Sequence, residues 1–300
     1  MGNARSLVVV GLVTLALTGH VGARASSRAH VRLHRPAANG HRLRRRTSVQ
    51  AQAAGDLTYR WGEFLTPGEP GSGGNGSGVG EAAGPVAVKD LTDVTAIAAG
   101  NGSDMALAAN GSVWTWGSGA LGSLGDGSTN SSLNIALEVM GLPRIVAIAE
   151  SENTDVALAA NGTVWGWGYN RSGQLCTGNT FSFDHPVKLG LTGVASMAGA
   201  GDHTLFLMAD GSVEACGDNT SGELGDGTFT TSRSPVSVVG LPSDSPVVAV
   251  SAAWRGSSAL LADGQVWDWG YGAEGQLGDG KFSTSDVPVE APLPSPAAEM

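Results

Sequence analysis

Short runs of apolar residues recur in one frame along the chain, and each run is followed by a turn signal. The runs begin at Val94, Ile145, Val194 and Val247. An Asn-Gly or Asp-Gly pair comes next in each, at Asn110-Gly111, Asn161-Gly162, Asp210-Gly211 and Asp263-Gly264. Both residues of such a pair tolerate positive φ, which favours a type I′ hairpin turn. The pattern therefore predicts pairs of short antiparallel strands joined by tight hairpins.

The second half of each repeat continues the pattern with two further strands. The segments VWTWG, VWGWG, VEACG and VWDWG alternate along a strand, and a glycine-rich turn of the form GxLGDG follows in three of the four repeats. A Pro-Val pair then marks a fourth strand in three repeats, at Pro186, Pro235 and Pro288. Proline suits an edge strand because it donates no ladder hydrogen bond.

Four short strands in a repeat of about fifty residues predict an all-β fold, a β-propeller of four-stranded blades. We place this domain at residues 57–292, with a tail at 293–300. It holds four full repeats and a degenerate half-repeat that starts at Trp61-Gly62 and ends at Pro85-Val86. With four to five repeats, the ring is expected to be small or open.

The side chains of the repeat predict how the blades pack. Strands nearest the propeller axis crowd together, which explains the alanines of the first strand. The repeat tryptophans, Trp116, Trp167 and Trp269, are expected to fill the space between neighbouring blades, each burying on the order of 200 Å². Cys216 stands in the same slot in the third repeat.

Charge is distributed very unevenly along the chain. Nine of the 17 basic residues lie within residues 1–50, all of them arginines, and none of the 27 acidic residues is there. From residue 51 onward, eight basic and 27 acidic residues leave a net charge of −19. Because such a body repels phosphate, we expect no binding of nucleic acid by the repeat domain.

The first 25 residues have the order of features of an export signal. Arg5 precedes an apolar stretch from Leu7 to Gly19, and Ala23-Arg24-Ala25 fits a cleavage site before Ser26. The apolar stretch is too short to span a membrane. We therefore predict a signal peptide at 1–25, a basic linker or pro-segment at 26–56, and a secreted, extracellular protein without a membrane span.

The repeat resembles that of the regulator of chromosome condensation family. The run LAANGSVWTWGSGALGSLGDGS and its three copies carry glycines, a WG pair and a GxLGDG turn where that repeat has them. The resemblance implies a propeller, usually of seven blades. Family members include exchange factors of a nuclear-transport GTPase and secreted bacterial binders, among them an inhibitor of β-lactamases. Export and the acidic body favour the secreted, bacterial-type group.

Motifs of catalysis, cofactor binding and metal binding are weak in this sequence. The glycines of residues 71–76 match a dinucleotide fingerprint, but no helix follows, so we interpret them as a loop. Residues 275–281 read GxxxxGK, but Phe282 stands where a magnesium-binding hydroxyl is needed. Asp126, Asp226 and Asp279 of the Gly-Asp-Gly turns are expected to hydrogen-bond their own backbone. We predict no catalytic residues, no metal and no cofactor.

The two cysteines, Cys176 and Cys216, lie in adjacent repeats. Export would permit a disulfide between them. Cys176 occupies a turn slot and Cys216 a strand slot, however, and the sequence leaves open whether these slots meet.

The segment after the first strand of each repeat varies while its neighbours stay fixed. Its four copies are residues 101–104, 152–155, 201–204 and 254–257, which we interpret as loops on one propeller face. They supply the predicted binding residues Asp104, Glu152, Asp155, Asp202, His203, Trp254 and Arg255. Tryptophan and arginine are the residues most enriched at interface hot spots. In the secreted inhibitor, the same loop also presents aromatics, and AAWRGSSAL is similar to its pattern.

These observations favour a non-catalytic propeller that binds an extracellular protein as a scaffold or inhibitor. Open blade edges would also allow self-association. Two alternatives remain: a regulator resembling a guanine-nucleotide exchange factor of a small GTPase, and an enzyme with a site at the central mouth. A rim of aromatic residues favours the binder, whereas a cluster of His, Asp and Glu on one rim favours the enzyme.

Overall fold

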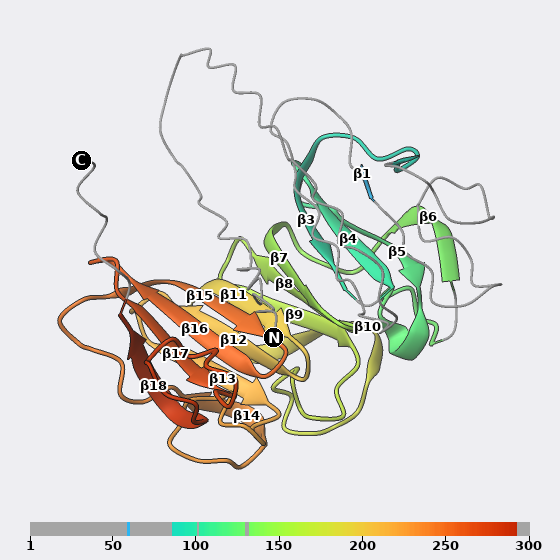
Figure 1. Cartoon of the computed structure of the whole chain (residues 1–300). Coiled ribbons are helices and arrows are strands. Elements are labelled where there is room, and N and C mark those ends of the chain that lie inside the picture. Colours follow the sequence, from blue (N-terminus) through green and yellow to red (C-terminus); the bar gives the residue numbers. More distant parts are fainter. Residues whose placement is uncertain (1–58, 61–85, 101, 130–131, 293–300) are drawn as a thin grey trace, which may run out of the picture.

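The computed structural model describes residues 59–60, 86–100, 102–129 and 132–292 (Figure 1). The predicted signal peptide, the basic segment up to residue 56, Trp61, Pro85 and the tail at 293–300 lie outside these residues. Among the described residues, no helix is both long and apolar enough to cross a membrane.

The described chain forms four four-stranded antiparallel sheets, as the repeat predicts. Blade 1 contains β3 (Val94–Ala99), β4 (Ser103–Ala108), β5 (Val113–Ser118) and β6 (Ser132–Glu138). Blade 2 contains β7 (Ile145–Ser151), β8 (Thr154–Ala159), β9 (Thr163–Gly168) and β10 (Phe183–Thr192). Blade 3 contains β11 (Val194–Ala200), β12 (His203–Met208), β13 (Val213–Gly217) and β14 (Ser232–Ser237). Blade 4 contains β15 (Val247–Ala253), β16 (Gly256–Leu261), β17 (Val266–Gly270) and β18 (Ser285–Ala291).

Strand order within every blade follows the chain, so each strand pairs with the next one. The three predicted prolines lie in β10, β14 and β18, which are edge strands of their sheets. A short pair, β1 (Tyr59–Arg60) with β2 (Val86–Ala87), precedes blade 1 where the half-repeat was expected. A short 3-10 segment, η1 (Ala120–Gly122), is the one helical element of the described residues.

The hairpin between the second and third strands differs from the predicted type I′ turn. Positive φ occurs at Gly111 but not at Asn110. The Gly111 N–H donates to the Ala108 carbonyl, and Asn110 Oδ1 accepts from the Ser112 N–H at 2.9 Å. This is a type I turn followed by a left-handed glycine, which also joins strands of the observed twist. The side chain at the Asn or Asp slot caps the turn, so only glycine has to supply the unusual backbone conformation.

Successive blades pack face to face, and the sheets form an arc in Figure 1. The first strands of neighbouring blades contact each other, β3 with β7, β7 with β11, and β11 with β15. Trp116, Trp167 and Trp269 are buried, and the clusters around Trp167 and Trp269 each join two blades. The prediction that tryptophans fill the interblade space is therefore confirmed for Trp167 and Trp269, whereas Trp116 packs with Val88 and Leu91, which precede blade 1.

Trp167 and Trp269 are each held by a hydrogen bond to the blade before them. The Trp167 indole N–H donates to the Ser123 carbonyl at 3.1 Å, and that of Trp269 to the Glu223 carbonyl at 2.7 Å. The ring then lies against the glycine of the GxLG turn, because a Cβ at Gly225 would come within 2.8 Å of Trp269 Nε1. Tryptophan and glycine are thus a matched pair across the interface.

The interface between blades 2 and 3 is built differently. Cys216 replaces the tryptophan, Cys176 replaces the turn glycine, and the two form a disulfide. Cys176 keeps the positive φ of the glycine it replaces, at 53°. Phe206, buried in the same cluster, stands where Ala106, Ala157 and Ala259 stand in the other blades. The question that the sequence left open is thereby answered: the strand slot and the turn slot meet between adjacent blades.

Candidate functional site

The segments predicted to be four-residue binding loops are two-residue turns. The first and second strands pair up to Ser151 with Thr154, Ala200 with His203, and Ala253 with Gly256. Only residues 152–153, 201–202 and 254–255 remain in those turns, and 101–102 are the matching positions of blade 1. The last two residues of each predicted loop begin the second strand, because pairing continues further than the variable sequence suggested.

These turns lie beside the loops that join the third and fourth strands. The N–H groups of Ser118, Tyr169, Asp218 and Tyr271 each donate to a turn carbonyl of the same blade at 2.7–2.9 Å. We call this surface the loop face. Among the described residues it consists of Gly102, the turns at 152–153, 201–202 and 254–255, and the loops at 119–129, 169–182, 218–231 and 271–284.

Three of the seven predicted binding residues are buried inside the fold. Asp104, Asp155 and His203 are each at most 3% exposed. They belong to the starts of β4, β8 and β12. We therefore exclude these three from the surface that a partner can contact.

His203 links blades 3 and 4. Its Nε2 lies 2.9 Å from Ser257 Oγ, and Ser257 Oγ donates to the Glu223 carbonyl at 2.7 Å. Burial lowers the pKa of His203 to about 4, so the ring is neutral at physiological pH. A neutral, buried ring with a hydroxyl partner stabilises the interface between two blades and is not accessible to a substrate from solution.

Asp155 occupies the slot that holds Thr204 in blade 3 and Ser257 in blade 4. Those two hydroxyls donate to carbonyls of the preceding blade. Neither carboxyl oxygen of Asp155 has a hydrogen-bond partner among the described residues, and burial raises the pKa of this side chain well above its usual value. Asp155 is therefore a buried group that favours its protonated form.

The other four predicted residues, Glu152, Asp202, Trp254 and Arg255, lie in the turns of the loop face. Trp254 is 60% exposed and packs against Gly201, where a Cβ would come within 3.0 Å of its ring. The Arg255 guanidinium lies 4.9 Å from the centre of the Trp254 ring. A tryptophan fixed on one side by backbone and stacked with its neighbour loses little freedom on binding.

Carboxylates surround the next turns of the loop face. Desolvation raises the pKa of Asp202, and the nearby charges of Glu152 and Asp218 raise it further. Gln174 Nε2 donates to Asp202 Oδ1 at 3.2 Å and opposes this effect. The backbone of Glu152 has a positive φ of 41°, which residues other than glycine rarely adopt. The fold thus holds several negative charges close together on this surface.

Three phenylalanines of the loop face were not identified from the sequence. Phe181, Phe229 and Phe282 lie in the third-to-fourth strand loops of blades 2, 3 and 4 and are 53–78% exposed. Together with Trp254 they are the exposed aromatic side chains of the described residues, and all four lie on this face. The sequence carried a signal for them, because each phenylalanine follows the glycine-rich turn of its repeat by two or three residues.

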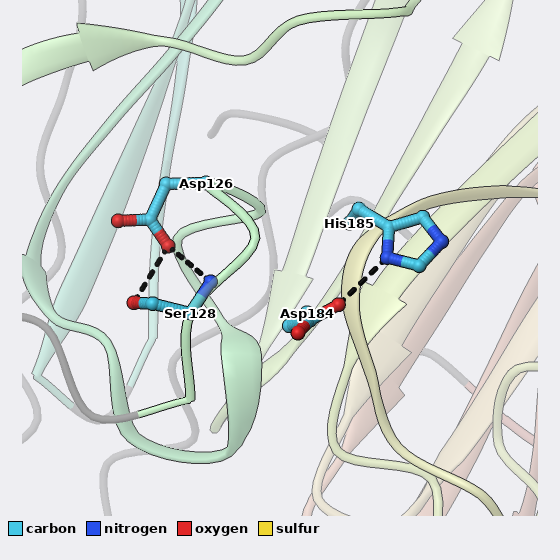
Figure 2. A network of polar contacts seen from close by, with 4 residues as sticks. All are labelled: Asp126, Ser128, Asp184 and His185. Carbon is cyan, nitrogen blue, oxygen red and sulfur yellow. Dashed lines mark hydrogen bonds and ion pairs between the residues drawn. The ribbon is translucent and has the colours of Figure 1, made fainter.

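The outer rim of the loop face is tied together between blades. The Gly127 N–H of blade 1 donates to the Asp184 carbonyl of blade 2 at 2.8 Å. Figure 2 shows the side chains at this junction: Asp126 Oδ1 accepts from the N–H and hydroxyl of Ser128, and Asp184 contacts His185 at 2.6 Å. The predicted capping role of the aspartates in the Gly-Asp-Gly turns is confirmed at Asp126 and equally at Asp226 and Asp279.

The described residues contain no group of three or more His, Cys, Asp or Glu side chains arranged to hold a metal ion. The loop face offers groups that make non-covalent contacts, namely an aromatic–cation pair, exposed aromatic rings and carboxylates.

A comparison with known protein families finds the "Regulator of chromosome condensation (RCC1) repeat" at residues 161–207, 210–260 and 263–298. The ultraviolet-B receptor UVR8 of Arabidopsis thaliana is 28% identical over 244 residues, which are 79% of this chain and 53% of UVR8. The human E3 ubiquitin-protein ligase HERC2 is 31% identical over 202 residues, 65% of this chain but 4% of HERC2. The chain therefore spans about half of UVR8 and a small part of HERC2.

Solved structures show the same fold. Prp20p from Saccharomyces cerevisiae superimposes with a TM-score of 0.69 at 23% identity, covering 79% of this chain and 59% of Prp20p. Human WBSCR16 gives a TM-score of 0.66 at 22% identity, covering 80% of this chain and 65% of that protein. These similarities confirm the predicted β-propeller architecture.

Proposed function

Since this chain is built from RCC1 repeats, we propose that it is a secreted, non-catalytic propeller that binds another protein through its loop face. The fold is a scaffold that presents turns and loops from rigid blades, and binding residues are commonly found on such loops. Scaffold or inhibitor is the role that follows from this arrangement.

The observation that carries the proposal is the gathering of exposed aromatic residues on one face. Aromatic residues and arginine are enriched at the centres of protein interfaces. Trp254 with Arg255 provides such an anchor, and Phe181, Phe229 and Phe282 extend the apolar contact toward the rim. Related propellers also engage proteins: yeast RCC1 (Prp20) has been crystallised with Kap60, and Prp20p has binding properties toward Gsp1p and histones.

Two features support export. The first 25 residues have the layout of a signal peptide. The Cys176–Cys216 disulfide takes the place of an interblade tryptophan, and such bonds persist in oxidising compartments. Expression in a bacterial host followed by N-terminal sequencing of the supernatant protein tests this part. A chain that begins at Ser26 is expected, whereas a cytoplasmic chain that keeps Met1 contradicts export.

Trp254→Ala tests the binding surface. A partner is first recovered from culture supernatant with the mature chain, and affinity is then measured by calorimetric titration. The variant is expected to lose more than about 2 kcal/mol of binding free energy, because a hot-spot side chain is removed. Its thermal melting point should change little, since Trp254 is largely exposed.

Asp263→Asn is the matched control, because Asp263 caps a hairpin on the opposite face and asparagine fills the same slot in blades 1 and 2. Normal binding by Trp254→Ala together with weak binding by Asp263→Asn would place the interface on the other face.

A further inference from the structure

The loop face and the beginning of the chain have complementary chemistry. Residues 26–50 contain seven arginines, from Arg28 to Arg46, and no acidic residue. The described body carries its exposed aromatic rings on the loop face, and the same face carries the neighbouring carboxylates of Glu152, Asp202 and Asp218. Arginine is the side chain that pairs with carboxylates and also stacks on aromatic faces.

We infer that the arginine-rich segment, residues 26–50, docks on the loop face of its own chain and covers it. This inference rests on the proposed function, because the covered surface is the one proposed to bind a partner. Docking would make the free protein autoinhibited, so that a partner has to displace the segment before it reaches Trp254.

The fold already shows the contact on which this docking depends. Arg255 stacks over Trp254 with 4.9 Å between the guanidinium carbon and the ring centre. Phe181, Phe229 and Phe282 offer further exposed rings on the same face. Each is therefore available to a guanidinium from elsewhere in the chain.

Carboxylates make the same surface attractive to cations. The raised pKa of Asp202 reflects repulsion by Glu152 and Asp218 in addition to desolvation. A cation that settles among these three groups relieves that repulsion, and several cations in one segment do so together. The body as a whole adds a long-range attraction, since it carries a net charge of −19 from residue 51 onward.

The connecting chain is long enough for the segment to reach. From residue 50 to β1 at Tyr59 an extended chain covers about 30 Å, and from Arg42 it covers about 55 Å, at about 3.3 Å per residue. A body of this size has a radius of gyration of about 18 Å. Arg42 can therefore extend from β1 well beyond that radius, and being tethered raises the local concentration of the segment around the body.

Trypsin cleavage of the full chain provides the test. Cleavage between Arg42 and Arg46 is followed by mass spectrometry under native conditions at about 20 mM and about 500 mM NaCl, because salt screens exposed charges. The test variant is Glu152→Gln, Asp202→Asn and Asp218→Asn combined. At low salt, the unaltered chain should be cut at least about tenfold more slowly than this variant, and at high salt the two should be cut equally fast.

The control variant removes three charges from the opposite face: Asp210→Asn, Asp244→Asn and Asp263→Asn. Asp210 and Asp263 cap hairpins in the slot where blades 1 and 2 have asparagine, so these changes keep the turn. This variant should be cut as slowly as the unaltered chain. Cleavage at Arg171 and Arg233 in the body reports whether any variant has lost its fold.

Equal cleavage of all three proteins at low salt would overturn the inference. So would equal protection in the two charge variants, which would mean that the overall charge of the body acts and not this face. Protection that grows with protein concentration would assign the contact to a second copy and overturn docking within one chain. The experiment contains no partner, so its failure leaves the result of the Trp254→Ala titration to decide the proposed function.

Discussion

The seam between blades 2 and 3 allows a quantitative test of how the blades are joined. Three residues differ together from the other repeats: Cys176 for glycine, Phe206 for alanine and Cys216 for tryptophan. If these form one coupled replacement, restoring all three should rebuild the ordinary interface. Changing only part of the set should leave either a gap or an overfilled core.

The disulfide sets the scale of the effect. It joins residues 40 apart in sequence, and closing a loop of that size lowers the entropy of the unfolded chain by the equivalent of about 4 kcal/mol. The variant Cys176→Gly, Cys216→Ala should lose about this much free energy of unfolding. Urea denaturation followed by circular dichroism measures the loss.

The triple variant Cys176→Gly, Phe206→Ala, Cys216→Trp should recover at least about 2 kcal/mol of that loss. The indole fills the room vacated by the phenylalanine ring, and its N–H reaches the Gln174 carbonyl, to which Cys216 Sγ now lies at 3.4 Å. That hydrogen bond alone contributes about 1 kcal/mol. Further gain comes from apolar surface that the larger ring buries.

A variant that keeps Phe206, Cys176→Gly with Cys216→Trp, is the control. Two bulky rings then compete for one space, and overpacking of this kind costs about 1–3 kcal/mol. The control should therefore be less stable than the triple variant. Equal stability of the two would refute the coupling, because it would show that Phe206 is not a substitute for tryptophan volume.

Three further measurements follow from the interior. Trp167→Ala should lower the free energy of unfolding by about 3–5 kcal/mol, and an unchanged thermal melting point would show that the ring does not seal the blade interface. Burial lowers the pKa of His203 in the folded state to about 4, below its ordinary 6.5. Its contribution to the free energy of unfolding should therefore be full above pH 6.5 and decline by about 3 kcal/mol toward pH 4. Urea titrations of His203→Gln at each pH should lack this decline. If the stability of the variant falls with pH as much as that of the unaltered protein, another group is responsible for the decline. Asp155 has a raised pKa, so it destabilises the fold once the pH exceeds the carboxyl's unfolded value. Asp155→Asn should therefore raise the melting point at pH 7 and leave it unchanged near pH 3, whereas a lower melting point at pH 7 would show that the carboxylate is paired.

The repeat frame predicted the blades because the residues that form turns and strands recur at the same positions in each repeat. The starts of all four first strands, at Val94, Ile145, Val194 and Val247, agree with the predicted starts. Turn glycines, alternating strands and edge prolines each act over a few residues, so a sequence pattern suffices to place them. The hairpin type differed because a cap by Asn110 requires positive φ only at the glycine.

The candidate site was predicted less well because burial depends on neighbours from other repeats. Variability after the first strand marked both exposed turn residues, such as Trp254, and buried strand residues, such as Asp155. Cross-strand pairing separates them, and no local pattern shows how far it extends. The disulfide was left open for the same reason, since its two slots meet only when adjacent blades stack.

The indole hydrogen bonds between blades give the domain a direction. Trp167 and Trp269 each donate to a carbonyl that lies earlier in the chain, and neither waits for a later residue. As the polypeptide emerges with its N-terminus first, blades 2 and 4 therefore find the acceptor of their indole already in place. The propeller can be built one blade at a time during synthesis. The single covalent seam has to wait until the third blade has emerged.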